Sequence, residues 1–445
     1  MGLKTVLFAL LFLAGCLGTF IGPIWPLLGY IAHYCIGPER QWWHEPLASL
    51  EVRYSMTLGA LTLVAMIFHA GQLRFGRSPF CGHEWLLVGL LAMVWLSVLI
   101  GPPAEGFYTH ADHPSVKFTK LVAFALMLTH IVTDRKNLDR LVWVLVLSAM
   151  VLGMQAWDTP YDQFAQGRLE SVGGADFREA NFLGGVMAAL LWLIGVQFLR
   201  CEWRGKIVCF LAGGFTANAV ILTRSRGAMV GLVAGGVAAV IMAPKRYRLY
   251  LIVGLALGAA GFYYLTDDRF WERSATITVE EGERDASAQS RIDLTRIGLQ
   301  MWRDRPWGIG AGNYFAAVGA YAHEQAGRDP HNTYIRALVE LGAQGFVMLA
   351  LLIGSAALML YRVRLAAYVL PERRGNDMLL LSYGFVCALA TMLACAMFIT
   401  FTYIEFWVWL LMMPVCLQRV MDNEQLDAGL GPVKVKRWAF GGRSC

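Results

Sequence analysis

Two arginines flank a serine in the stretch ILTRSRGAMVG, where a tight turn joins two apolar runs. A guanidinium group presents a planar pair of N–H donors that can bind a phosphate group through two hydrogen bonds at once. The helix that follows the turn directs the positive end of its dipole to the same place. Snorkelling to a membrane interface accounts for one such side chain but less well for two. Arg224 and Arg226 therefore predict a phosphate-binding turn, which Arg168 and Asn181 could also line.

A histidine stands where the segment DPHNTYIRALVELGAQG changes from polar sequence to an apolar helical pattern. Asp329 and Pro330 are common at helix starts, which places His331 in or beside the first turn. Because the positive end of the helix dipole disfavours imidazolium, a neutral imidazole is expected near pH 7. That group can act as a general base toward a hydroxyl, or it can only orient the hydroxyl by a hydrogen bond. The alternative is an interfacial polar residue, and Glu340 farther along is expected to be structural.

The loop from Thr266 to Asn332 is the only long polar segment between apolar runs, and it is rich in arginine. It contains eight arginines and no lysine, together with eleven aspartates and glutamates. The arginines could bind phosphate as a set, or the acidic residues could simply neutralise them in a solvated loop. The eight arginines are Arg269, Arg273, Arg284, Arg291, Arg296, Arg303, Arg305 and Arg328.

Within this loop, SRIDLTRIGLQMWRDRPWGIGAGNY predicts a helix followed by a flexible glycine-rich connection. Ser290 and Asp293 fit a capping box, which puts Arg291 in the first turn, and Pro306 is expected to end the helix. The glycine pattern is not a dinucleotide-binding fingerprint, since no strand precedes it and the final glycine is missing. The expected apolar stripe of the helix consists of Leu294, Ile297 and Met301.

The composition of the chain indicates a membrane environment. Its 445 residues are 57% hydrophobic and 16% charged, with a mean hydropathy of +0.50, whereas a soluble domain carries about 25% charged residues. Apolar runs of helical length recur without the alternation of strands, and this predicts an all-α integral membrane protein. The expected spans are 54–71, 85–101, 117–133, 138–156, 180–199, 206–222, 226–243, 247–265, 332–361, 378–400 and 405–419.

The basic residues of the short loops predict which face is cytoplasmic. DRKNLDR, RCEWRGK and similar loops fall on one face, so the long arginine-rich loop lies outside. With Met1 in the cytoplasm, residues 3–36 must cross once in net terms, in two pieces broken by Gly22, Pro23 and Pro26. About 12 crossings with both termini cytoplasmic are expected. The expected divisions are N-terminal membrane helices at 1–265, a large external loop with short helices at 266–331, C-terminal membrane helices at 332–419 and a cytoplasmic tail at 420–445.

No metal or cofactor site is expected from the spacing of potential ligands. The nine cysteines include no CxxC pair and most fall in apolar spans, which favours small buried side chains over disulfides or zinc ligands. The stretch HADH and the pair Asp267 and Asp268 have no partner motif, so both are interpreted as ordinary loop polarity. Arginine charge could take the place of a metal near a phosphate group.

Three segments of the chain, in order, resemble the signature segments of the O-antigen ligase and O-antigen polymerase superfamily. They are TRSRGAMVGL, SRIDLTRIGLQMWRDRPWGIGAGNY and HNTYIRALVELGAQG, and the preceding GRLESVGGADFREANFLGG resembles an outer loop of the same family. The resemblance covers Arg168 to about Gly345. By position, Arg226, Arg291 and His331 match the family's functional residues, and Arg224 and Arg168 are weaker matches; Asn181 and Arg296 are possible lining residues of the site.

The resemblance implies an inverting, metal-independent glycosyltransferase with a GT-C-like fold in the bacterial inner membrane. Such enzymes transfer a glycan from undecaprenyl diphosphate on the periplasmic face to an acceptor hydroxyl. His331 would then be the catalytic residue, and Arg226, Arg291 and Arg224 would bind the diphosphate. The acceptor could be lipid A-core, as in lipopolysaccharide biosynthesis, another glycan repeat, or a protein side chain; lipid A-core is the working assignment.

Two functions without chemistry also fit outward-facing arginines. A flippase or exporter of lipid-linked glycan should keep charged residues along a path through the membrane and often shows repeated halves. Here the outer charges cluster after Gly167 and the spans are poor in charge, which favours an enzyme. The same clustering argues against a purely structural scaffold.

Overall fold

The computed structural model describes residues 2–103, 108–165, 167–243, 247–265, 286–368 and 370–429. Within these ranges the chain is helical, and an isolated bridge joins Ala165 and Arg168. Each expected span overlaps a single helix. The helices are α1 (Leu3–Gly18), α2 (Ile24–Ile36), α3 (Glu45–Ala48), α4 (Tyr54–Phe68), α5 (Gly82–Ile100), α6 (Pro114–Ile131), α7 (Arg135–Asp158), α8 (Ala180–Arg200), α9 (Trp203–Thr223), α10 (Arg226–Met242), α11 (Arg248–Leu265), α13 (Ala286–Asp304), α14 (Tyr314–Tyr321), α15 (Thr333–Ala367), α16 (Glu372–Cys395) and α17 (Glu405–Asp427).

Several of these helices have the length and composition of membrane spans. In the described part of the chain, six helices are long and apolar enough to cross a membrane, namely α5, α7, α8, α9, α15 and α16. Apolar helices of 10–17 residues include α1, α4 and α10. These features agree with a multi-pass membrane protein, whereas the expected 12 crossings and the GT-C-like fold stay predictions.

The first two helices form an antiparallel hairpin. Gly22 and Pro23 lie in the break between them, as expected, whereas Pro26 lies in the first turn of α2. Near the start of α1, however, the Thr5 hydroxyl donates to the Trp43 carbonyl at 2.6 Å, and Trp43 follows the end of α2. Lys4 also forms an ion pair with Asp158, the last residue of α7, at 3.0 Å.

This hairpin corrects the expectation that residues 3–36 cross once in net terms. The two pieces return the chain to the end of the bundle where it began. The last turns of α17 lie at the other end of α7, where Glu424 pairs with Arg135 at 3.5 Å. The start of α1 and the last turns of α17 therefore lie at opposite ends of α7. The side of the membrane on which each terminus lies stays a prediction.

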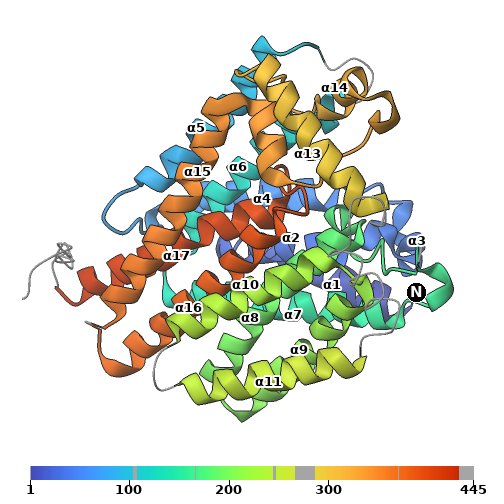
Figure 1. Cartoon of the computed structure of the whole chain (residues 1–445). Helices are drawn as coiled ribbons and strands as arrows, with labels where there is room; N and C mark the ends of the chain where they lie inside the picture. Colours follow the sequence, from blue (N-terminus) through green and yellow to red (C-terminus); the bar gives the residue numbers. More distant parts are fainter. Residues whose placement is uncertain are drawn as a thin grey trace, which may run out of the picture.

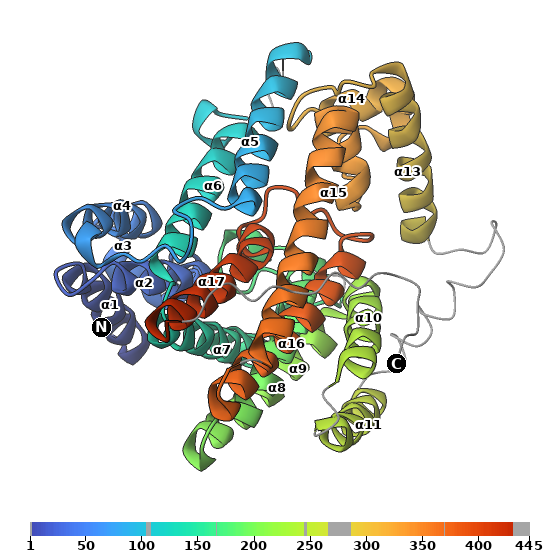
Figure 2. The same cartoon turned by 90° about the vertical axis from the view of Figure 1, so that its left-hand side faces the viewer.

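Helix α17 is buried almost all around and packs against α6, α15 and α16. Figure 1 and Figure 2 show it running through the middle of the bundle. Every residue from Phe406 to Leu417 is buried, and Trp407 and Trp409 are among the largest fully buried side chains. A helix that is apolar on every side is a core helix, so α17 serves as the scaffold around which the others pack.

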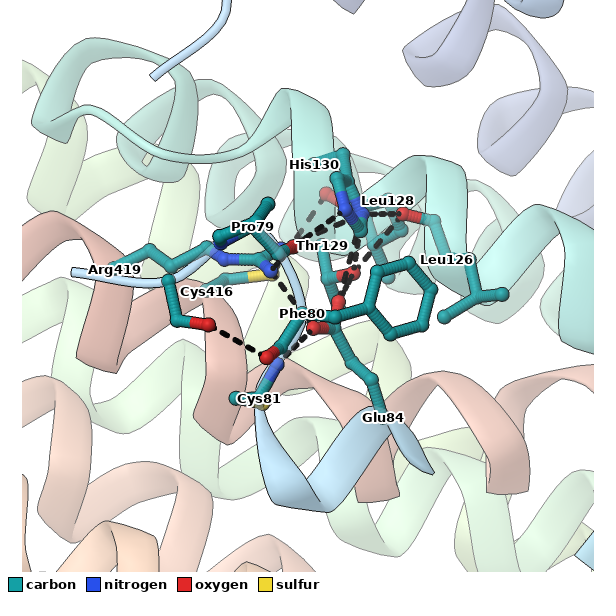
Figure 3. Close-up of polar contacts among 11 residues, drawn as sticks. Pro79, Phe80, Cys81, Glu84, Leu126, Leu128, Thr129, His130, Cys416 and Arg419 are labelled. Atoms are coloured by element: carbon teal, nitrogen blue, oxygen red, sulfur yellow. Dashed lines mark hydrogen bonds and ion pairs between the residues drawn. The ribbon is translucent and has the colours of Figure 1, made fainter. Parts of the chain in front are cut away.

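An ion pair between buried side chains joins α17 to α5 at the end of α7 that begins with Arg135 (Figure 3). Arg419 donates from Nη2 to Glu84 Oε2 at 2.7 Å, and both residues are buried. The Thr129 hydroxyl of α6 donates to Glu84 Oε1 at 2.6 Å, and the backbone N–H of Cys81 donates to Oε2 at 2.9 Å. His130 lies beside the pair, with Nδ1 at 3.5 Å from Glu84 Oε1. The carboxylate is therefore fully satisfied, and the cluster ties three helices together.

Removing one partner of this pair is expected to destabilise the fold strongly, because the other charge stays buried without compensation. We expect Glu84→Leu to lower the free energy of unfolding by about 3 kcal/mol or more. Thermal unfolding of the purified protein in detergent measures this, with the exposed Glu45→Leu as the control. Glu84→Leu combined with Arg419→Leu should recover part of the loss, since the double variant buries no lone charge. An unchanged melting temperature for Glu84→Leu alone would contradict the structural role.

Helix α15 is interrupted near its first third, and the segment that follows α13 packs against this interruption. Gly342 has φ 72° and ψ −178°, so the helix is interrupted there. The N–H groups of Ile309 and Gly310 donate to the carbonyls of Val339 and Glu340, both at 3.0 Å. A Cβ on Gly342 would lie 2.4 Å from the Trp307 carbonyl carbon, so glycine is required for this close approach.

The break divides α15 into an outer piece of residues 333–341 and a longer piece of 343–367. The non-helical backbone of Gly342 supplies a physical reason for a change of direction between the two pieces. It also places α13 and α14 beside the first part of α15, as Figure 2 shows. The glycine-rich connection, expected to be flexible, is held by backbone hydrogen bonds to α15.

Candidate active site

The predicted site residues come from the first turn of α8, which contains Asn181, and from four other places in the chain. These are the segment 159–179 before α8, the turn between α9 and α10, the helix α13, and residues 328–332 before α15. Arg269, Arg273, Arg284 and the pair Asp267 and Asp268 lie outside the described residues. Within the rest of the outer segment, each predicted position can be located.

Asn181 connects the segment before α8 to the turn between α9 and α10. Its Oδ1 accepts hydrogen bonds from Arg168 Nη2 at 2.7 Å and from the Ser225 hydroxyl at 2.9 Å. Arg168 also donates from Nε to the Thr223 carbonyl at 3.1 Å. Ser225 is the N-cap of α10, and its Oγ accepts from the Ala228 N–H at 3.3 Å. The structure therefore brings Arg168 and Asn181 to the arginine-containing turn, as the sequence predicted.

The two arginines of the turn occupy different positions. Arg224 ends α9 in the left-handed conformation with φ 45°, and its guanidinium donates to the carbonyl of Gly167. Arg226 is the first residue of α10 and is half-buried. Arg224 thus helps to hold the segment before α8 against the turn, while Arg226 stands at the start of a helix, where an anion is favoured.

His331 lies just before α15 in a strained backbone conformation. Its φ is 46°, in the left-handed region that costs roughly 1–2 kcal/mol for a residue other than glycine. Asn332 is the N-cap of α15, with its side chain accepting from the N–H groups of Tyr334 and Ile335 at 3.0 and 3.1 Å. His331 is therefore beside the first turn rather than in it. A strained residue in a loop of this kind points to a functional constraint.

Asp329 holds the conformation of His331. Its Oδ1 accepts the backbone N–H of His331 at 2.7 Å and lies 3.8 Å from the imidazole Nδ1. The hydroxyl of Thr400 donates to the same oxygen. Asp329 Oδ2 accepts from Arg336 Nη1 at 2.8 Å. Both carboxylate oxygens are thus engaged, and the aspartate is fixed next to the imidazole.

A buried polar chain extends from Asp329 along the outer piece of α15. Arg336 donates from Nε to Glu340 Oε1 at 3.0 Å, and the Tyr403 hydroxyl donates to Glu340 Oε2 at 2.7 Å. Glu340 is fully buried, and Arg336 is nearly so. The prediction that Glu340 is a structural group is confirmed by these bonds. These hydrogen bonds connect Asp329 to buried side chains and so fix its orientation.

Residues 396–404, between α16 and α17, bind the start of α15, and sequence reasoning missed them. The Thr333 N–H donates to the Ala396 carbonyl at 2.8 Å, and the Phe401 N–H donates to the Thr333 hydroxyl at 2.8 Å. Together with the contacts of Thr400 and Tyr403, these bonds make the segment 396–404 a strap across the His331 loop. The polar run TFTY after an apolar helix was the available signal in the sequence.

The charges around His331 show which arginines share its surroundings. Burial lowers the pKa of His331, and the positive charges of Arg291, Arg168 and Arg336 lower it further, while Asp329 opposes them. The neutral imidazole is therefore favoured near pH 7, as predicted. Burial is the principal cause, whereas the sequence argument relied on the helix dipole.

Glu179 is a second titratable group in this region. It precedes α8, and desolvation together with the negative charges of Asp329 and Glu170 raises its pKa to about 6. The positive charges of Arg168 and Arg291 act in the opposite direction. Two arginines, a histidine and three carboxylates thus act on one another at this end of the bundle. No sequence motif singled out Glu179.

Helix α13 corrects part of the prediction for the arginine-rich segment. It already includes Ala286, so Ser290 and Asp293 are not a capping box and Arg291 is past the first turn. The Ser290 hydroxyl instead donates to Gln325 Oε1 at 3.0 Å. The apolar stripe is confirmed, since Leu294 and Met301 are buried and Ile297 packs against them. The helix ends at Asp304, before Pro306, as expected.

Arg296 stands apart from the other candidates. It lies about 140° around α13 from Arg291, at 100° per residue. Its side chain is 66% exposed, and its Nη1 is 4.0 Å from Asp293. The placement favours Arg291 over Arg296 as a lining residue of the site.

The HADH stretch has local structural roles. The Thr109 hydroxyl donates to Asp112 Oδ2 at 2.6 Å, and His113 Nδ1 accepts from the Ser115 N–H at 3.3 Å as the N-cap of α6. In the described ranges, no group of three or more His, Cys, Asp or Glu side chains could hold a metal ion. These polar residues are accounted for by turn and cap geometry.

Part of the chain matches a known protein family. Residues 207–350 match the protein-family model described as O-Antigen ligase. No curated protein matches the chain. The matched segment contains Arg226, Arg291 and His331, and it ends before the strap at 396–404. Residues 207–350 are therefore similar to an O-antigen ligase domain, and this match supports the resemblance of the chain to the O-antigen ligase and O-antigen polymerase superfamily.

Proposed function

We propose that this chain is a membrane glycosyltransferase that transfers a glycan from undecaprenyl diphosphate to an acceptor hydroxyl. The observation that carries the proposal is the shared surroundings of His331, Arg291 and Arg168, in which two guanidinium charges act on an imidazole. A lipid-linked glycan donor and a membrane setting follow from the family. Lipid A-core is the proposed acceptor, on the periplasmic face of the inner membrane, in lipopolysaccharide biosynthesis.

In the proposed reaction, the diphosphate is already a good leaving group. The acceptor oxygen forms a bond to the anomeric carbon while the bond from that carbon to the diphosphate oxygen breaks. The electron pair of the broken bond stays on the diphosphate, and the configuration at the anomeric carbon inverts. Arg226 and Arg291, with Arg224 and Arg168 beside them, stabilise the charge that develops on the leaving oxygen. No metal ion is needed for this step, because the guanidinium groups supply the positive charge.

The proton of the acceptor hydroxyl goes to His331. Its lowered pKa keeps the imidazole neutral and able to accept a proton. Asp329 acts as a positioning residue, because it fixes the backbone of His331 and lies near Nδ1. An aspartate in this place also stabilises the imidazolium that forms during proton transfer.

Replacing Asp329 tests this positioning role through the pH dependence of transfer. The Asp329 carboxylate raises the pKa of His331 against the lowering effect of burial and the arginines. We expect Asp329→Asn to lower that pKa further, so the acidic limb of the kcat/KM profile moves to lower pH. Asp293→Asn on α13 is the control and should leave the limb in place. A lower rate with an unmoved acidic limb would mean that Asp329 only supports the fold.

The decisive experiment is transfer in vitro with purified full-length protein. A glycan on undecaprenyl diphosphate is supplied with lipid A-core, with a second lipid-linked glycan, or with a serine-containing peptide. Lipid A-core as the best acceptor supports the ligase, while a preference for glycan or peptide assigns the polymerase or the protein oligosaccharyltransferase. Movement of the lipid-linked donor across the membrane of vesicles, without any glycan transfer, would support a flippase. Activity should persist in a strong chelator, and a loss restored by a divalent cation would overturn the metal-free mechanism.

A further inference from the structure

A groove of about 630 Å³ lies between the start of α2 and the first turns of α7, away from the proposed active site. The two helices run in the same direction. At one end of the pair Gln155 Nε2 donates to the Ile36 carbonyl at 3.1 Å, and at the other the Arg140 guanidinium lies 4.8 Å from the ring centroid of Trp25. Helix α7 begins at Arg135, so it extends about 7 Å beyond the level of Arg140. The short α1–α2 hairpin therefore leaves the beginning of α7 uncovered.

The walls of this groove divide into a charged part and an apolar part. Arg135, Lys136 and Arg140 line it from the first turns of α7. Trp25, Leu28 and Trp143 form the apolar part. Tryptophan is enriched where the headgroup region of a membrane meets the acyl chains. The groove thus offers cations to a headgroup and an apolar surface to the chain attached to it.

Charge pairing within the fold leaves two of these cations for a ligand. Asp139 also lines the groove, but it pairs with Arg200 at 2.5 Å, and Arg135 pairs with Asp377 at 3.4 Å. Arg140 donates to a neutral partner, Asn137 Oδ1, at 2.9 Å. Among the described residues neither Lys136 nor Arg140 forms an ion pair with a carboxylate. Their charge is complementary to an anion.

The surface beside the groove is apolar. Leu17, Phe20 and Ile21 lie at and next to the turn between α1 and α2, and Phe20 is 83% exposed. A free phosphate ion would gain nothing from such a surface, whereas the acyl chains of a lipid would lie against it. Positive loops also place this end of α7 at the cytoplasmic leaflet, where anionic lipids attract basic residues.

We propose that this groove binds one anionic glycerophospholipid, with the phosphate between Lys136 and Arg140 and the acyl chains against Trp25 and Trp143. The site is independent of the glycosyl transfer proposed above. Phosphatidylglycerol fits the net positive lining, whereas the added ammonium of phosphatidylethanolamine is repelled by it.

The test is the retention of phosphatidylglycerol by detergent-purified full-length protein, titrated by native mass spectrometry. Each basic residue near a membrane surface contributes about 1 kcal/mol to binding of anionic lipid. We therefore expect K136Q with R140Q to weaken phosphatidylglycerol binding by about 30-fold. The matched control is R204Q with K206Q at the start of α9. It removes the same two positive charges from outside the groove, where Arg204 and Lys206 lie over the rings of Trp203 and Phe198. The control should bind the lipid as the unmodified protein does.

The single variant K136Q keeps the proposal testable even if the double variant does not fold. Lys136 is exposed, so its replacement leaves the packing of α7 intact. About a 5-fold weakening is expected for it. Equal losses in the pocket and control variants, or equal retention of phosphatidylethanolamine and phosphatidylglycerol, would overturn the proposal.

Discussion

Replacing His331 with alanine is expected to lower the rate of glycan transfer by about 10²–10⁴-fold, the usual contribution of a general base. The loss should appear in kcat, because the proton is transferred only as the new bond forms. The variant should still insert and fold, since Asn332, not His331, caps α15. Transfer from the undecaprenyl diphosphate donor, measured with the protein in detergent, gives the rate.

A further variant separates the two roles open to the imidazole. His331→Asn keeps a hydrogen-bonding side chain but cannot accept a proton near pH 7. If His331 is a general base, His331→Asn should transfer glycan as slowly as His331→Ala. If His331 only orients the acceptor, His331→Asn should keep part of the transfer rate. His323, exposed in the same outer segment, is the control. Normal transfer by His331→Ala would remove the histidine from the mechanism.

Replacing Arg291 with alanine is expected to lower kcat for transfer by about 10²–10³-fold, because a preorganised donor to the leaving diphosphate is lost. The same direction is expected for Arg226→Ala. Arg291→Lys keeps the charge but not the planar pair of donors, so it should recover only part of the rate. Single-turnover transfer and donor binding, measured separately, show whether the loss lies in chemistry or in affinity.

Arg296→Ala is the internal control for this experiment. It removes the same charge from the same helix, at a side chain that is 66% exposed beside Asp293. Transfer should stay close to normal. Equal losses for Arg291→Ala and Arg296→Ala would show that the arginine effect is general electrostatics of the outer segment rather than contact with the diphosphate.

The positions of the helices could be predicted because their signals are local. A run such as 180–199 is apolar over the length of a bilayer, and α8 occupies Ala180–Arg200. Gly22 and Pro23 break the first segment for reasons that lie in their own backbones. The stripe Leu294, Ile297 and Met301 follows from helical periodicity alone. Composition and spacing within a few turns were enough for these features.

Other features depended on partners distant in the sequence. The direction of α2 relative to α1 is decided by contacts such as Thr5 with Trp43 and Lys4 with Asp158. The break at Gly342 is stabilised by backbone donors about thirty residues earlier, which no periodicity reveals. Local pattern also misplaced the start of α13, since Ser290 resembles a cap but bonds Gln325 instead.

The residues of the candidate site also fall into two groups, those that local sequence predicted and those that depend on distant partners. His331, Arg226 and Arg291 were predicted from residue type, position and the family resemblance, Arg168 from its place before α8, and Asn181 from its place at the start of that helix. The residues that fix His331 were not found, because Thr400 and Tyr403 follow it by about seventy residues and reach it through buried hydrogen bonds. Glu179 was missed because its shifted pKa arises from neighbours brought together only by folding.

The strap at 396–404 limits how modular the matched domain is. A chimera that moves residues 207–350 into another polytopic chain would carry His331 and Arg291, but it would leave behind Arg168, the hydroxyl of Thr400 and the phenol of Tyr403. Such a graft must therefore import the last two helices as well, and recombination between relatives should be tolerated at junctions that keep both pieces from the same parent.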